Sequence, residues 1–106
     1  MREIFWLKEA EDELTDIVNY VLNTHGQNTA LRVYDEIIHR IDLLAEFPEL
    51  GTSETLYCFN GMPLRVLHSK HTRVFYCALE TNIIVVLLWS HRMDDKKLKE
   101  AIAPRN

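Results

Sequence analysis

Arginine and histidine side chains collect in the C-terminal half of the chain, where most neighbouring residues are apolar. Arg65, Arg73, His91 and Arg92 stand near the ends of three apolar runs within residues 63–92. A guanidinium group can bind two oxygens of one phosphate or carboxylate, and an imidazole can transfer a proton near neutral pH. These residue types predict an anion-binding site, either for RNA phosphate or for the carboxylates of a protein.

The pairing of the strands decides whether these side chains meet. A turn centred on residue 70 makes Arg65 and Arg73 diagonal neighbours on one face of the sheet, about 7–8 Å apart. A turn centred on residue 81 places Arg73 opposite Trp89, and His91 continues that face. We therefore predict a cluster at one end of the sheet, with Arg92 close by. The prediction depends on the register, because a slip of one residue moves every side chain to the other face.

Two interpretations of this cluster stay open. In the structural one, the arginine stems lie along apolar neighbours while the charged ends stay in water. In the functional one, the cluster contacts a macromolecule. No carboxylate or hydroxyl group stands at a spacing that forces a catalytic triad with a histidine. We expect Tyr76 to be a half-buried strand residue and not a catalyst.

Other common enzyme motifs are absent from the sequence. The three glycines form no nucleotide-binding loop, and there is neither a pair of catalytic carboxylates nor a Cys–His signature. We expect Cys58 and Cys77 to be reduced thiols, because a cytosolic chain with its own core does not need a disulfide. Together with His68, His71 and His91 they form no CxxC or HxxxH pair. We therefore expect no metal and no cofactor.

Length and composition indicate one globular domain over residues 1–106, with 47% hydrophobic and 26% charged residues. No stretch approaches the roughly 18 consecutive apolar residues of a membrane span. Acidic residues from Glu9 onward argue against a signal peptide, so we expect a cytoplasmic protein without membrane contact. Residues 1–57 hold 4 Lys/Arg and 12 Asp/Glu, whereas residues 58–106 hold 8 and 4. This asymmetry fits either a basic working surface on the C-terminal half or ordinary solvated faces.

The first half of the chain has a helical pattern after one short strand. Apolar residues at a spacing of three and four make one stripe in each of two predicted helices. The predicted elements are a strand at 2–7, a helix from Lys8 to Gly26, and a helix capped by Asn28 or Thr29 that ends at Phe47-Pro48. The short link around Gly26 predicts an antiparallel hairpin.

The second half has a strand pattern. Residues 48–54 are predicted to be a loop, 56–59 an edge strand and Asn60-Gly61 a turn. Three strands follow within residues 63–92, separated at 69–71 and 80–82. Met93-Asp94-Asp95 can cap a short helix over residues 96–102, and the tail at 104–106 is expected to be frayed. We therefore predict an α+β domain, with a helical hairpin packed on a small twisted antiparallel sheet.

Several segments also resemble a known family in their order and spacing. They are Ala10 to Leu14, Ile17 to Tyr20, Ala30 to Ile37, Leu43 to Gly51, Leu64 to Leu67, Thr72 to Tyr76 and Ser90 to Asp94. Through them nearly the whole chain resembles the RelE/ParE superfamily of bacterial type II toxin–antitoxin toxins, and most closely its ParE (plasmid stabilisation) branch. The fold that the resemblance implies is the one predicted above.

The resemblance implies two different activities. RelE-like members cut mRNA on the ribosome with a basic, tyrosine-bearing site, to which Arg73 and Arg92 correspond and near which Arg65 falls. This chain has Leu67 where that site has a second basic residue, and it has no tyrosine after Asp94. ParE-like members poison DNA gyrase and are held inactive by an antitoxin. The depleted site and the long helical hairpin favour the ParE branch.

Three functional hypotheses follow. The first is a toxin that inhibits DNA gyrase by binding, with Arg65, Arg73, His91 and Arg92 as anchors and a cognate antitoxin that neutralises it in a hetero-oligomer. The second is a ribosome-dependent mRNA endoribonuclease that uses Arg73, Arg92 and His91. The third is a non-toxic module that binds an antitoxin. An antitoxin segment that folds on binding needs a groove, and we expect exposed apolar residues on the sheet or the hairpin to mark that groove.

Overall fold

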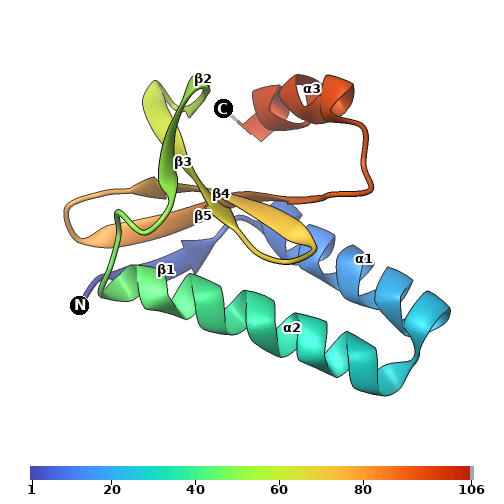
Figure 1. Cartoon of the computed structure of the whole chain (residues 1–106). Coiled ribbons are helices and arrows are strands. Elements are labelled where there is room, and N and C mark those ends of the chain that lie inside the picture. Colours follow the sequence, from blue (N-terminus) through green and yellow to red (C-terminus); the bar gives the residue numbers. More distant parts are fainter. Residues whose placement is uncertain (106) are drawn as a thin grey trace.

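A five-stranded sheet separates a helical hairpin from a short C-terminal helix (Figure 1). The computed structural model describes residues 1–105. Its elements are β1 (Glu3–Trp6), α1 (Lys8–His25), α2 (Gln27–Asp42), η1 (Leu43–Ala45), β2 (Thr52–Phe59), β3 (Met62–His68), β4 (Thr72–Ala78), β5 (Asn82–Ser90), η2 (Asp95–Lys97), α3 (Leu98–Ile102) and η3 (Ala103–Arg105). The sheet order is β1-β5-β4-β3-β2, with β1 parallel to β5 and all other pairs antiparallel. The predicted α+β class is confirmed.

One glycine joins the two long helices. Gly26 has a φ of +88°, a left-handed value that other residues adopt only with strain. Its amide closes the last turn of α1, and its carbonyl oxygen accepts the Ala30 amide in the first turn of α2. The predicted cap at Asn28 or Thr29 is wrong, because α2 already begins at Gln27 and has no side-chain cap.

The apolar stripes of the two helices pack against one face of the sheet, as predicted. The stripe residues that are buried there are Ala10, Leu14 and Ile17 of α1 and Val33, Ile37 and Ile41 of α2, with Leu44 of η1. Burying one such aliphatic side chain contributes about 1.5–3 kcal/mol, so this layer fixes the hairpin on the sheet. Among residues 1–105, no helix has the length and apolarity that crossing a membrane requires.

The strand at the far edge of the sheet is longer than predicted. β2 begins at Thr52, inside the segment expected to be a loop, and its register shifts between Glu54 and Cys58. The predicted Asn60-Gly61 turn is confirmed, with φ values of +50° and +77°. Positive φ at both positions is typical of the two-residue turn whose twist matches that of a hairpin.

Two-residue turns also join β3 to β4 and β4 to β5. The Ser69 amide donates to the Thr72 carbonyl at 2.9 Å, and the Leu79 amide donates to the Asn82 carbonyl at 2.8 Å. The predicted register assumed turns centred on single residues, Lys70 and Thr81. With two-residue turns, each residue next to the turn pairs with a partner one position away from the predicted one. In the first hairpin, Arg65 pairs with Tyr76 instead of Phe75.

In the second hairpin a bulge restores the predicted register for the residues farther from the turn. Tyr76 pairs with Val85, but Phe75 pairs with Leu87, so Val86 is an extra residue in β5. Beyond the bulge Arg73 pairs with Trp89, as predicted. A bulge inserts one residue into one strand of a ladder, which turns the following side chains over.

The C-terminal segment covers the second face of the sheet. The Asp94 side chain accepts the Lys96 amide at 3.0 Å and caps the turn that leads into α3, as predicted. Leu98 and Ile102 of this segment are buried in a second core with Phe75 and Trp89. The first turn of the predicted helix is a 3₁₀ turn, and the α-helix proper begins at Leu98.

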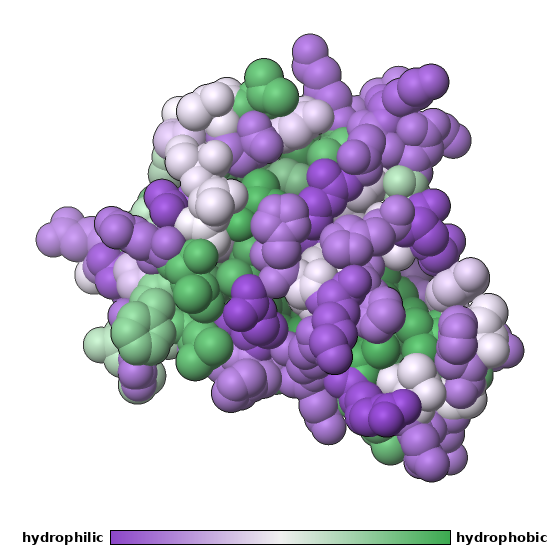
Figure 2. Space-filling model, viewed as in Figure 1, coloured by the Kyte–Doolittle hydropathy of each residue, from purple (hydrophilic) through white to green (hydrophobic). Residues whose placement is uncertain are grey.

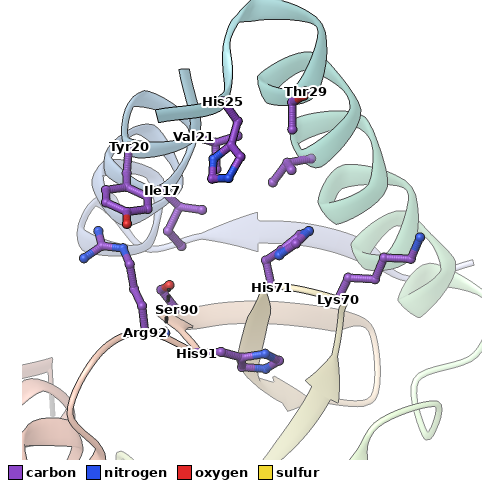
Figure 3. Close-up of a pocket in the computed structure, with 11 residues that line it drawn as sticks. Ile17, Tyr20, Val21, His25, Thr29, Lys70, His71, Ser90, His91 and Arg92 are labelled. Carbon is purple, nitrogen blue, oxygen red and sulfur yellow. Dashed lines mark hydrogen bonds between the residues drawn. The ribbon is translucent and has the colours of Figure 1, made fainter. Parts of the chain in front are cut away.

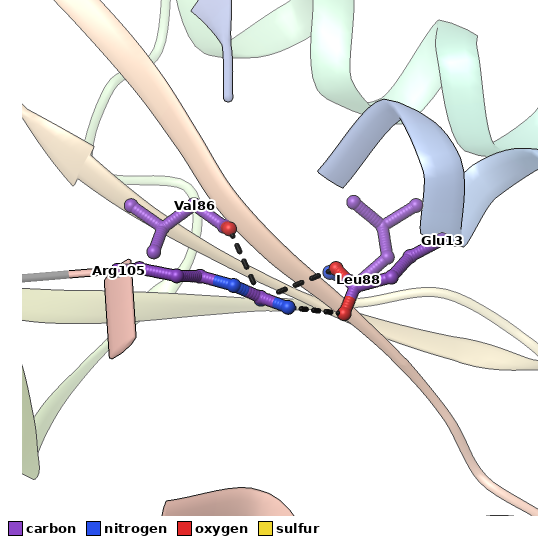
Figure 4. A network of polar contacts seen from close by, with 4 residues as sticks. All are labelled: Glu13, Val86, Leu88 and Arg105. Atoms are coloured by element: carbon purple, nitrogen blue, oxygen red, sulfur yellow. Dashed lines mark hydrogen bonds and ion pairs between the residues drawn. The ribbon is translucent and has the colours of Figure 1, made fainter. Parts of the chain in front are cut away.

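The tail was expected to be frayed, but Arg105 is held against the sheet. Its guanidinium group donates to both carboxylate oxygens of Glu13, at 2.6 and 3.2 Å, and to the Val86 carbonyl at 3.3 Å (Figure 4). The Leu88 amide donates to the same carboxylate at 3.1 Å. These backbone groups of β5 are available because β1 pairs with β5 only as far as Val85, which the sequence pattern did not predict. Asn106, the last residue of the predicted tail, lies outside the described residues.

Candidate functional site

The offset register separates two of the predicted site residues. Arg65 pairs with Tyr76, which belongs to the core under the helices, whereas Arg73 pairs with Trp89, which belongs to the core under α3. The two arginines therefore lie on opposite faces of the sheet. The prediction that Arg65, Arg73 and His91 form one cluster is wrong, because the turn that joins β3 to β4 contains two residues and not three.

Arg65 is bound by the loop before β2. Its guanidinium group donates to the Gly51 carbonyl at 2.7 and 3.1 Å and to the Glu49 carbonyl at 3.3 Å. Beside it, the Tyr76 hydroxyl donates to the Pro48 carbonyl at 2.7 Å and accepts the Gly51 amide at 2.9 Å. Tyr76 is thus fully buried, not half-buried as expected. Both side chains hold the loop in place.

Arg73 lies in a shallow hollow of about 240 Å³ beneath α3. Its guanidinium group makes a short ion pair with Asp95, at the start of the C-terminal segment. Tyr57 of β2 and His68, which pairs with Arg73 across β3 and β4, line the same hollow. The arrangement brings a cation, an imidazole and a phenol together, but an acidic side chain already neutralises the cation.

His91 and Arg92 meet at a different place, where the closed end of the helical hairpin faces the ends of the central strands. They line a pocket of about 270 Å³ together with side chains of both helices and of the β3–β4 turn (Figure 3). Ile17, Val21 and Val33 form its apolar wall. In the view of Figure 2, apolar surface is visible between polar side chains at this end of the hairpin. We call this cavity the hairpin pocket.

The position of Arg92 is set by an aromatic ring of α1. Its guanidinium carbon lies 3.8 Å from the centre of the Tyr20 ring, a stacking distance for a cation on an aromatic face. Among residues 1–105 no carboxylate or carbonyl group bonds to this guanidinium group. Its N–H groups at the edge of the pocket are therefore available to an anion.

The rim of the hairpin pocket is cationic although the chain has a net charge of −4. Its cations are Lys70 and Arg92. The imidazoles of His25, His71 and His91 also line the pocket, and none of the eleven lining residues is acidic. Figure 3 shows His25 and His71 pointing into the space between the helices and the strand ends. Among residues 1–105, no three His, Cys, Asp or Glu side chains are close enough to hold one metal ion.

The residues on the helical side of this site were not predicted from the sequence. Tyr20 and His25 were not among the candidates, and Lys70 was treated only as part of a turn. One signal was present, because Ile17, Val21 and His25 follow one another at intervals of four and so share a helix face. A histidine that continues an apolar stripe past its last aliphatic residue marks where the stripe reaches the edge of the core.

Two partly or fully buried groups elsewhere have a raised pKa. Burial raises the pKa of Cys77 to about 11, so this thiol is unreactive, whereas Cys58 is exposed, and both are free. Burial also raises the pKa of Glu13, and this effect exceeds the opposite effects of Arg105 and of the Leu88 amide. Neither group lines the hairpin pocket.

Comparison with known families gives one match over most of the chain. Residues 4–95 match the family model described as the ParE toxin of the type II toxin–antitoxin system parDE. The matched residues include Arg65, Arg73, His91 and Arg92. No curated protein sequence matches the chain.

Solved structures share the fold at low sequence identity. A structure described as the chromosomal ParDE toxin–antitoxin system from P. aeruginosa aligns with a TM-score of 0.70 and 16% identity, over 85% of this chain and 96% of the other. A copper-bound mutant toxin from Helicobacter pylori aligns with a TM-score of 0.54 and 14% identity, over 86% and 96% of the two chains.

Proposed function

The chain belongs to the family of ParE toxins of parDE type II toxin–antitoxin systems, and from this premise we propose that it inhibits DNA gyrase by binding and that a cognate antitoxin neutralises it. The observation that carries the proposal is how the four candidate residues are used. Arg65 and Arg73 are engaged by the fold itself, and only His91 and Arg92 share a pocket. A binding function needs exposed anchors but no assembled acid, base and phosphate clamp.

The contact with gyrase uses the rim of the hairpin pocket in this proposal. Arg92 is exposed and fixed by Tyr20, so little of its side-chain freedom is lost when it meets a carboxylate or a phosphate. Arg65 binds the carbonyl groups of the loop before β2, so we no longer propose it as an anchor for gyrase. Arg73 can contact gyrase only if its ion pair with Asp95 breaks.

A supercoiling assay tests the proposal. Purified toxin at micromolar concentration is expected to block supercoiling by gyrase or to stabilise its cleavage complexes. Arg92→Glu is expected to weaken this inhibition by about tenfold or more, since it reverses a charge at the contact. Lys99→Glu, on the opposite side of the sheet, is the matched control. Unaffected gyrase at micromolar toxin would exclude gyrase as the target.

A second candidate function, ribosome-dependent mRNA cleavage, is favoured by one observation. Tyr57, His68 and Arg73 line one hollow, and these are residue types that donate protons and stabilise a phosphorane-like transition state. Cleavage of mRNA only in the presence of translating ribosomes would select this function. In that case Arg73→Ala should lower the rate by roughly 100-fold. Cleavage that survives this substitution would remove Arg73 from the mechanism.

Expression in growing cells separates both candidates from a non-toxic binding module. Expression without the neighbouring antitoxin gene is expected to arrest growth, and co-expression with that gene is expected to restore it. Growth that continues without the antitoxin would favour a module that binds the antitoxin but has no target.

A further inference from the structure

The hairpin pocket differs from the other concave regions of the molecule in having a mostly apolar interior and an unopposed cationic rim. Ile17, Val21 and Val33 supply the interior. Arg92 stands at the rim on the Tyr20 ring with its N–H groups free of carboxylate and carbonyl partners in residues 1–105. A cation with no internal partner, placed beside apolar surface, indicates a ligand that carries both an apolar body and a negative charge.

The cavity is too small to enclose a whole small molecule. A volume of about 270 Å³ lies below the roughly 300–1,000 Å³ of sites that enclose a whole small molecule. It suits one or two side chains of a larger partner. The rim extends from α1 across the β3–β4 turn to the residues after β5, so the partner must present charge on more than one side of its apolar anchor.

Every element around the pocket contributes lining side chains, but not every element contributes a charge. α1 contributes Tyr20 and His25, and α2 contributes the uncharged Thr29 and Val33. The β3–β4 turn contributes Lys70 and His71, the end of β5 contributes Ser90, and the residues directly after β5 contribute His91 and Arg92. The carboxylate of Glu36 lies beside the turn but accepts from the Ser69 hydroxyl and the Lys70 amide, each at 3.3 Å. That carboxylate is not among the groups that line the pocket.

We infer that the hairpin pocket receives an acidic, amphipathic segment of the antitoxin, with an aromatic or branched aliphatic side chain in the cavity and carboxylates against Arg92, Lys70 and the histidines. The inference rests on the proposed function, because it takes the antitoxin as the partner. It adds the place of contact and the chemistry of the segment. An antitoxin seated there covers His91 and Arg92, the same side chains that the proposed gyrase contact needs, so that neutralisation is direct competition for one surface.

The experiment measures binding of the full-length antitoxin, encoded next to the toxin gene, to purified full-length toxin by calorimetry. Arg92→Glu with Lys70→Glu is expected to weaken binding by about 100-fold, since two favourable charge contacts become repulsive. Lys99→Glu makes a charge change of the same kind on α3 and is expected to alter binding less than about threefold. Thr29→Trp fills the pocket without changing charge and should weaken binding as well, by about tenfold or more. Thermal melting of each variant shows that it is folded.

The outcomes separate failure of the proposed function from failure of the proposed contact at the hairpin pocket. Wild-type toxin that does not bind the antitoxin contradicts the proposed function itself. Tight wild-type binding that neither the double charge reversal nor Thr29→Trp weakens contradicts this inference and leaves the proposed function standing. Loss of gyrase inhibition in the double variant with antitoxin binding intact assigns the pocket to the target alone, and also overturns the inference.

Discussion

At the hairpin pocket Arg92 stacks on Tyr20 and has no acidic partner among residues 1–105, whereas on the opposite side of the sheet Arg73 is paired with Asp95. Both arginines stand at the same end of the central strands. The difference arises from the chain after β5, because Asp95 opens the segment that folds back over Arg73, while the pocket side receives no such cover. An arginine near a strand end therefore becomes a binding residue only where the fold leaves it without a partner.

Arg105→Ala should have the largest effect on the free energy of unfolding. It leaves the largely buried Glu13 carboxylate without its counter-charge, and we expect a loss of about 2–3 kcal/mol at neutral pH in urea titrations. The loss should shrink as the pH falls below the pKa of Glu13, because a protonated carboxyl group needs no cation. Glu13→Gln in the same background should recover part of the stability. An equal loss at pH 4 and pH 7 would mean that Arg105 acts by packing alone.

Arg65→Ala should have the next largest effect. It removes the donors of the Gly51 and Glu49 carbonyls, each a charge-assisted hydrogen bond, so we expect a loss of about 1–2 kcal/mol. Hydrogen exchange in the loop at 48–51 should accelerate. Arg65→Lys is the control, since it keeps the charge but loses the fork that reaches both carbonyls. If Arg65→Ala instead leaves stability unchanged and abolishes toxicity, Arg65 contacts the target after all.

Asp95→Ala tests whether the ion pair conceals a second anion site. The pair is partly exposed, so we expect a stability loss of only about 0.2–1 kcal/mol. If the release of Arg73 creates an anion site, single-stranded RNA should bind the variant more tightly at low salt, with affinity falling as salt rises. Asp94→Ala controls for the neighbouring cap. RNA binding equal to that of the unsubstituted chain would show that the hollow beneath α3 does not bind phosphate.

Arg92→Ala should have the smallest effect on stability, within about 0.5 kcal/mol, because the side chain is exposed and has only its contact with Tyr20 to lose. The same substitution should produce the clearest loss of partner binding among these four. Calorimetry and melting on one preparation separate the two quantities. A stability loss as large as that of Arg65→Ala would remove the contrast between the two arginines.

Much of the fold was predictable because its signals are local. The stripes of the helices and the Asn60-Gly61 turn each depend on residues close together in the chain. Residues 48–54 were less predictable, since the pairing of Thr52 with Val66 depends on a partner 14 positions away. The same holds for Arg105, whose partner Glu13 lies 92 positions away.

The candidate site was predictable only in part, because its geometry depends on single-residue differences in pairing. The turn of two residues that joins β3 to β4 turned Arg65 away from Arg73, whereas the bulge at Val86 left Arg73 opposite Trp89 as expected. Such offsets leave composition and hydrophobic pattern unchanged when both faces of a strand are buried, as in β5. His91 and Arg92 were found because they follow the last strand directly.

The outer edge of β5 raises a matter of self-association. β1 pairs with β5 only as far as Val85, so the rest of that edge has no neighbouring strand among residues 1–105 and is covered by side chains instead. Glu13 accepts the Leu88 amide and Arg105 donates to the Val86 carbonyl, so two side chains occupy the groups through which a strand from a second molecule would dock. We therefore expect the ion pair to prevent strand pairing between molecules. A chain truncated before residue 105 should form fibrils or dimers at concentrations where the intact chain remains monomeric.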